Sequence, residues 1–72
     1  INNISRLTGA ERELIKYLLQ EFSVAEIAKC RCVEVVTVKT QIKGILRKFG
    51  CGRTKEIVRM IRQMNLTHLF LN

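Results

Sequence analysis

The feature that most limits how this chain can fold is a pair of helix-start signals lying close together. Each is a hydroxyl residue followed three positions later by a glutamate, as in Thr8-Gly-Ala-Glu11 and Ser23-Val-Ala-Glu26. In such a capping box the hydroxyl accepts a hydrogen bond from the glutamate amide, and the carboxylate accepts one from the amide of the first residue. The signals begin fifteen residues apart, so a first helix must end near Gln20–Glu21 and a second must begin at Val24.

Apolar residues at steps of three and four predict two further helices. The longest stripe covers residues 35–49 and ends at Gly50, a residue suited to the left-handed conformation that follows many helices. A fourth helix is predicted to begin with Thr54 as its cap. The apolar positions of these two helices are Val35, Val38, Ile42, Ile45, Leu46, Phe49, Ile57, Val58, Ile61 and Met64. The sequence therefore predicts an all-α four-helix bundle, a single domain over residues 1–72 with its core within 7–64.

Several functional classes find no support in the residues present. Asp is absent, the glutamates at helix starts are explained by capping, and no cysteine has a base nearby, so we predict no enzyme. Cys30, Cys32, Cys51 and His68 lack the spacing of a metal site, and we expect three partly buried thiols with no metal and no cofactor. No apolar run approaches the roughly 20 residues that span a bilayer.

The charge is strongly uneven along the chain. Residues 1–34 hold five basic and five acidic groups, whereas residues 35–72 hold eight basic groups and a single acid, Glu56. The whole net charge of +7 therefore lies in the second half. This pattern indicates a polyanionic partner, either nucleic acid or an anionic membrane surface.

The predicted third helix concentrates this charge on its outer face. Its basic residues Lys39, Lys43 and Arg47 recur every four positions, and no acid interrupts them. A solvated face gains nothing from excluding glutamate, but a face against phosphate is weakened by each one. A short helix, a tight turn and a longer helix with a polar outer face form the helix-turn-helix arrangement, in which the second helix enters the major groove. We therefore predict base contacts from Lys39, Thr40 and Lys43, and DNA backbone contacts from Thr37, Arg47, Lys48 and Arg53.

Five short motifs at matching spacing resemble the LuxR-type (FixJ- or GerE-type) DNA-binding domain of bacterial transcription regulators. They are Leu7-Thr8-x-x-Glu11, Glu26-Ile27-Ala28, Thr37-Val38-Lys39, Ile45-x-x-Lys48-Phe49-Gly50 and Arg53-Thr54. The resemblance implies a sequence-specific, cytoplasmic regulator that binds double-stranded DNA as a homodimer through its fourth helix. Met60 and Met64 widen the apolar face of that helix. The chain opens with Ile1 rather than Met, so we expect it to be the C-terminal part of a longer regulator.

The chain departs from this family at four positions. The family usually has Gly at Glu21, Leu at Arg31, Ser at Glu34 and His at Gln41. From these departures we expect an altered turn at Glu21, a cysteine (Cys30 or Cys32) filling the core in place of residue 31, and a poorly capped third helix.

Two other functions remain open from the sequence. The helix-turn-helix could be a degenerate one that serves as a protein-interaction module, which would fit the unusual Arg31 and Glu34. Alternatively, residues 35–49 could form a basic amphipathic helix that binds an anionic membrane or a partner groove. That helix would need a large aromatic anchor, and Phe49 is the one aromatic residue that it has.

Overall fold

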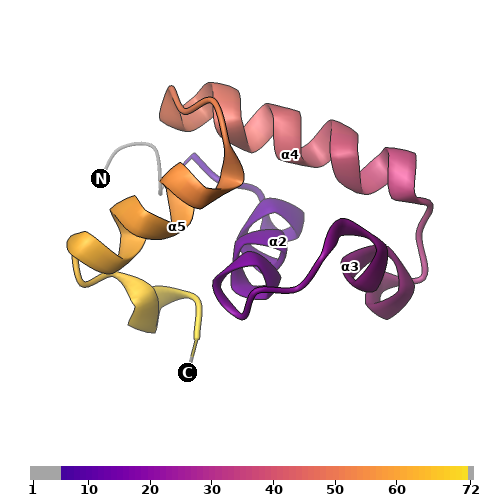
Figure 1. Cartoon of the computed structure of the whole chain (residues 1–72), viewed down its shortest axis with the longest axis horizontal. Coiled ribbons are helices and arrows are strands. Elements are labelled where there is room, and N and C mark those ends of the chain that lie inside the picture. The colour runs from indigo at the N-terminus through magenta and orange to yellow at the C-terminus, as the bar shows by residue number, and fades with distance from the viewer. Residues whose placement is uncertain (1–5, 72) are drawn as a thin grey trace.

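The computed structural model describes residues 6–71, and every regular element in that range is helical (Figure 1). The prediction of an all-α fold is therefore confirmed. The last element is a short 3₁₀ turn, and no strand occurs within residues 6–71. In chain order the elements are α2 (Gly9–Leu19), α3 (Val24–Arg31), α4 (Val35–Phe49), α5 (Thr54–Gln63) and η1 (Thr67–Leu69).

Both capping boxes form as predicted. The Glu11 amide donates to Thr8 Oγ1 at 3.1 Å, and the Thr8 amide donates to Glu11 Oε1 at 3.0 Å. At the start of α3 the Glu26 amide donates to Ser23 Oγ at 3.1 Å, and the Ser23 amide donates to Glu26 Oε1 at 2.8 Å. These local bonds fix where α2 and α3 begin.

The start of α5 is one residue away from its predicted position. Thr54 is the first helical residue rather than the cap, and Arg53 occupies the capping position. The Glu56 carboxylate instead accepts hydrogen bonds from the amides of Gly52, at 2.8 Å, and Arg53, at 3.0 Å. The Glu56 carboxylate thus closes the turn before α5, and the residue at the capping position makes no side-chain capping bond to the first turn of the helix.

Within residues 6–71, each of the helices α2 to α5 is followed by a residue in the left-handed conformation. Their φ angles are 65° at Glu21, 56° at Cys32, 67° at Gly50 and 56° at Asn65. The expectation of an altered turn at Glu21 was wrong, because Glu21 adopts the conformation that glycine would have supplied. The Phe22 amide closes this turn on the Tyr17 carbonyl at 3.1 Å, and the two rings lie 5.2 Å apart. This bond and the apolar contact are those of a Schellman motif, which offsets the cost of the left-handed residue.

Helix α4 contacts each of the other α-helices and runs across the top of Figure 1, with α2 and α3 below it. The core lies beneath it. The fully buried side chains come from every α-helix and are Leu14, Ile15, Ile27, Val38, Ile45, Ile57 and Ile61. The exposed surface of α4 therefore faces away from all the elements that support it.

Two predicted core residues are exposed instead. Val35 is 41% exposed and Met64 is 43% exposed. Val35 lies where the chain leaves the core, since residues 33–37 are all exposed. Met64 is the last residue before the left-handed Asn65.

The segment after α5 returns to the core, which the sequence pattern did not predict. Phe70 is 8% exposed, and the Arg12 guanidinium lies 5.2 Å from the centre of its ring. Arg12 Nη2 also donates to the Leu69 carbonyl at 3.2 Å. The core therefore extends past Met64 to Phe70.

Arg31, rather than a cysteine, fills the space at its own position. Its side chain is 13% exposed and its Nε lies 3.2 Å from Glu13 Oε1, while its Nη1 donates to Gln41 Oε1 at 2.8 Å. Cys30 and Cys32 are exposed, so the prediction that one of them fills the core was wrong. Arg31 on α3 thus joins α2 through an ion pair and α4 through a hydrogen bond, and two departures from the family pattern contact each other.

Candidate nucleic-acid interface

The outer face of α4 is a row of three cations. Lys39, Lys43 and Arg47 are all exposed, and the buried Val38 and Ile45 lie on the other side of the same helix. Four residues advance a helix by about 6 Å, so the row spans about 12 Å. We call Lys39, Lys43 and Arg47 the cation row.

The cation row has no carboxylate partner within the described part of the chain. The ion pairs found in residues 6–71 join Arg31 to Glu13 and Lys48 to Glu11, and neither involves the row. These three charges are therefore not compensated by a carboxylate within 4 Å in that range, and an anion from outside can approach them.

The two threonines of this face have different hydrogen-bonding capacity. Thr40 Oγ1 donates to the Val36 carbonyl at 2.9 Å, so its proton is used within the helix and its oxygen is left as an acceptor. The exposed Thr37 hydroxyl makes no hydrogen bond with another group of residues 6–71, so it can both donate and accept. The predicted base contact from Thr40 is thus restricted to groups that donate, such as a base amino group.

The first turn of α4 is poorly capped, as expected. Glu34 occupies the N-cap position, but its side chain makes no capping hydrogen bond. A serine or threonine there would accept a bond from an amide two or three residues on. The first turn of α4 contains no acidic residue, and the nearest one in sequence is Glu34 at the N-cap position.

An apolar side chain stands out on this polar face. Val36 is 61% exposed, more than any other large hydrophobic residue within residues 6–71, and Val33 and Val35 beside it are also exposed. At 100° per residue, Val36 lies between Lys43 and Arg47 when α4 is viewed down its axis. The helical period alone puts Val36 on this outer face, but a single valine in the sequence indicates no role.

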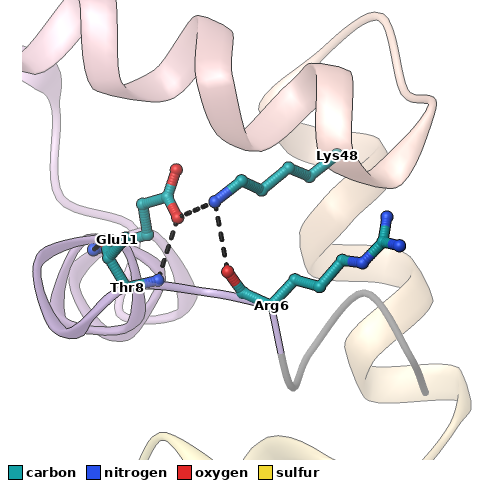
Figure 2. A network of polar contacts seen from close by, with 4 residues as sticks. All are labelled: Arg6, Thr8, Glu11 and Lys48. Atoms are coloured by element: carbon teal, nitrogen blue, oxygen red, sulfur yellow. Dashed lines mark hydrogen bonds and ion pairs between the residues drawn. The ribbon is translucent and has the colours of Figure 1, made fainter.

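Lys48 differs from the cation row because its charge is engaged inside the protein. Its Nζ donates to Glu11 Oε1 at 2.5 Å and to the Arg6 carbonyl at 3.2 Å (Figure 2). The side chains of Lys48 and Glu11 are 32% and 12% exposed. The sequence grouped Lys48 with the DNA backbone contacts, whereas the structure gives it partners on α2 and on the segment before it.

Glu11 is the anionic centre of this contact. Burial raises the pKa of its carboxyl, but the hydrogen bond and charge of Lys48, together with the hydrogen bonds of Thr8, outweigh burial and hold the pKa below its ordinary value. Gly44 on α4 faces it, since a Cβ there would lie 3.5 Å from Glu11 Oε2. The ionised carboxylate therefore lies between α2 and α4.

The remaining predicted residues lie away from the cation row in the chain. Arg53 is exposed at the start of α5. Met60 is half-buried and Met64 is exposed. Residues 6–71 contain no group of three His, Cys, Asp or Glu side chains that could hold a metal ion, and no helix in that range is long and apolar enough to cross a membrane.

Comparisons with protein family models, with curated proteins and with solved structures found no match for this chain. What the chain binds must therefore be inferred from the side chains that it exposes.

Proposed function

We propose that the chain is a sequence-specific DNA-binding domain of a bacterial transcription regulator, of the LuxR type that its motifs resemble. The observation that supports this most strongly is the cation row of α4, three exposed charges without a carboxylate partner in the described residues. Double-stranded DNA is bound mainly through its phosphates, and each Lys or Arg that approaches one releases counterions.

The arrangement of α3 and α4 suits a helix-turn-helix. Helix α3 has eight residues, α4 has fifteen, and residues 32–34 join them. Arg31 holds the two helices together through Gln41. In this arrangement the N-terminal part of the second helix lies deepest in the major groove. Lys39 and Lys43 are the side chains of that part that can donate to guanine O6 and N7.

The other polar residues take positions around this contact. Thr40 accepts from a base amino group, because its own proton is bonded to the Val36 carbonyl. Thr37, Arg47 and Arg53 contact the phosphate backbone. Lys48 acts chiefly within the protein, through Glu11. Val36 gives the face an apolar group that fits the methyl of thymine, a contact that the major groove offers at each A·T pair.

Dimerisation on DNA is part of the proposal. Met60 of α5 and Met64, which directly follows that helix, are about 40° apart around its axis, and Met64 is 43% exposed. A two-fold contact there would match a two-fold symmetric binding site. Met60→Glu should shift the domain towards monomer in sedimentation while its helix content stays unchanged. A loss of helix content would instead place Met60 in the core.

Selection of bound sequences from a random duplex pool tests the proposal and its alternatives together. We expect enrichment of one motif with two-fold symmetry, and an affinity that falls steeply as salt rises. A protein-interaction module would enrich no motif. A membrane-binding helix would bind vesicles of anionic lipid more tightly than duplex DNA, which the same titration with vesicles would detect.

A further inference from the structure

A second surface of the domain lies between the end of α2 and one flank of α5. It is a groove of about 590 Å³, with Leu18 of α2 and Val58 of α5 as its apolar lining. Leu18 is 9% exposed and Val58 is half-buried. The groove is therefore floored by side chains that are already fixed by the core, so a ligand would meet a surface that is largely formed beforehand.

Three cations edge this groove. Lys55, Arg59 and Arg62 line it at positions four and three residues apart along α5, against one carboxylate, that of Glu21. Arg62 Nη2 donates to the Leu19 carbonyl at 3.1 Å, which holds its guanidinium at the junction of the two helices. Lys55 and Arg59 are exposed and have no ion pair within residues 6–71. The groove therefore combines an apolar floor with a net positive edge.

We propose that this groove binds an acidic segment of a partner protein, which places an apolar side chain on Leu18 and Val58 and its carboxylates against Lys55, Arg59 and Arg62. Charge complementarity of this kind sets partner choice and speeds association. Nucleic acid would satisfy the cations but would leave the apolar floor uncovered. The apolar side chains of Leu18 and Val58 would then add little to the affinity.

A second copy of the chain fits the groove less well. In a two-fold contact the same surface patch of both copies meets, so the cationic edge of one groove would lie against the cationic edge of the other. The groove also lies on a different flank of α5 from Met60 and Met64, since Arg59 and Met60 are separated by about 100° around the helix. The proposal therefore does not depend on the DNA-binding function or on dimerisation through the two methionines.

The test is selection of peptides from a random displayed library on the folded domain, followed by titration of the enriched peptides. We expect enriched peptides to share clustered Asp and Glu beside one large apolar residue. Their affinity should fall about tenfold or more on Arg59→Glu, and likewise on Lys55→Glu. The matched control is Lys16→Glu, an equal charge change at an exposed position of α2 that does not line the groove. It should leave peptide affinity unchanged.

Circular dichroism of each variant separates lost binding from lost folding, and Lys55→Glu serves if Arg59→Glu does not fold. The proposal is overturned if no peptide is enriched, if the enriched peptides are not acidic, or if both groove variants bind them as the wild type does. If no acidic peptide is enriched and Arg59→Glu loses duplex DNA binding as Lys43→Ala does, the cations of the groove are a nucleic-acid contact instead. Failure of the wild type to bind DNA would contradict the proposed function alone.

Discussion

Lys48 Nζ lies 2.5 Å from Glu11 Oε1, and this ion pair joins the last turn of α4 to the first turn of α2 (Figure 2). The same carboxylate oxygen accepts the hydrogen bond from the Thr8 amide that caps α2. One oxygen thus serves both the start of α2 and the attachment of α4. The glutamate of the first motif and the lysine of the fourth, which are 37 positions apart in sequence, are linked for a structural reason.

Lys48→Ala should therefore destabilise the fold. The change leaves the mostly buried Glu11 carboxylate without its cation, and breaking a buried pair is costly. Since the Lys48 side chain is about one-third exposed, solvent screening reduces the expected cost to about 1–2 kcal/mol. Urea unfolding measures it, with Lys43→Ala as the control, because Lys43 is exposed and outside both ion pairs of residues 6–71. Equal stability of the two variants would contradict this role of Lys48.

Acid should weaken the fold through Glu11. Its folded pKa lies below the ordinary value of 4.5, so around that pH the unfolded chain binds more protons than the folded one. The stabilisation is complete at pH values above the unfolded pKa and is lost as the pH falls through the folded pKa. The pKa of Glu26 is also lowered, by its hydrogen bonds with the Ser23 amide and hydroxyl. Part of the stability that the fold loses in acid therefore comes from Glu26.

The variant Glu11→Gln isolates the Glu11 contribution. Glutamine can still complete a capping box but does not titrate. The unfolding free energy of this variant, measured by urea at several pH values, should depend less on pH below 5 than that of the wild type. An unchanged pH slope would mean that Glu11 is not linked to folding.

The local parts of this fold could be predicted from sequence because their signals lie within a few residues. A capping box joins positions three apart, and the stripe of α4 repeats every turn, so the starts of α2 and α3 and the extent of α4 followed directly. The same helical period also predicted that the cation row lies on the outer face of α4.

The features that sequence missed depend on contacts between distant residues or on unusual backbone. Arg31 meets Gln41 and Glu13 only once three helices are assembled, and Lys48 meets Glu11 in the same way. Phe70 is buried by the return of an aperiodic tail. Glu21 and Cys32 adopt the left-handed conformation although neither is glycine, because the bonds that close the turn outweigh the local preference.

Arg31 and Gln41 should be energetically coupled. Their hydrogen bond joins α3 to α4 at 2.8 Å, and its donor is charged. A double-mutant cycle with Arg31→Leu and Gln41→Ala should give a coupling free energy of about 1 kcal/mol in urea unfolding. Because the bond links α3 to the proposed recognition helix α4, Arg31→Leu should also reduce DNA specificity, although Arg31 itself is not proposed to contact DNA. Additive effects of the two changes would show that the bond contributes nothing to the fold.

Glu34→Ser should improve both the fold and DNA binding. Serine supplies the missing N-cap of α4, worth about 0.5–1 kcal/mol of stability, and removes a negative charge from the end of the helix that we propose enters the major groove. Thermal unfolding measures the first effect, and affinity for random duplex at low salt measures the second. Glu34→Ala is the control that removes the charge without adding a cap. Weaker binding by the serine variant would mean that Glu34 contacts a base itself, such as a cytosine amino group.

The most direct test of sequence recognition by α4 compares the DNA affinities of Lys43→Ala and Arg47→Ala. Each variant is titrated with the selected duplex and with a scrambled duplex over a range of salt concentrations. Lys43 is predicted to contact bases, so its loss should cost about 1–3 kcal/mol on the selected site and much less on the scrambled one. Arg47 is predicted to contact phosphate, so its loss should weaken both alike and lower the salt slope by about one. If both variants lose affinity equally on the two duplexes, the cation row is a general electrostatic surface, and the claim that α4 recognises sequence is wrong.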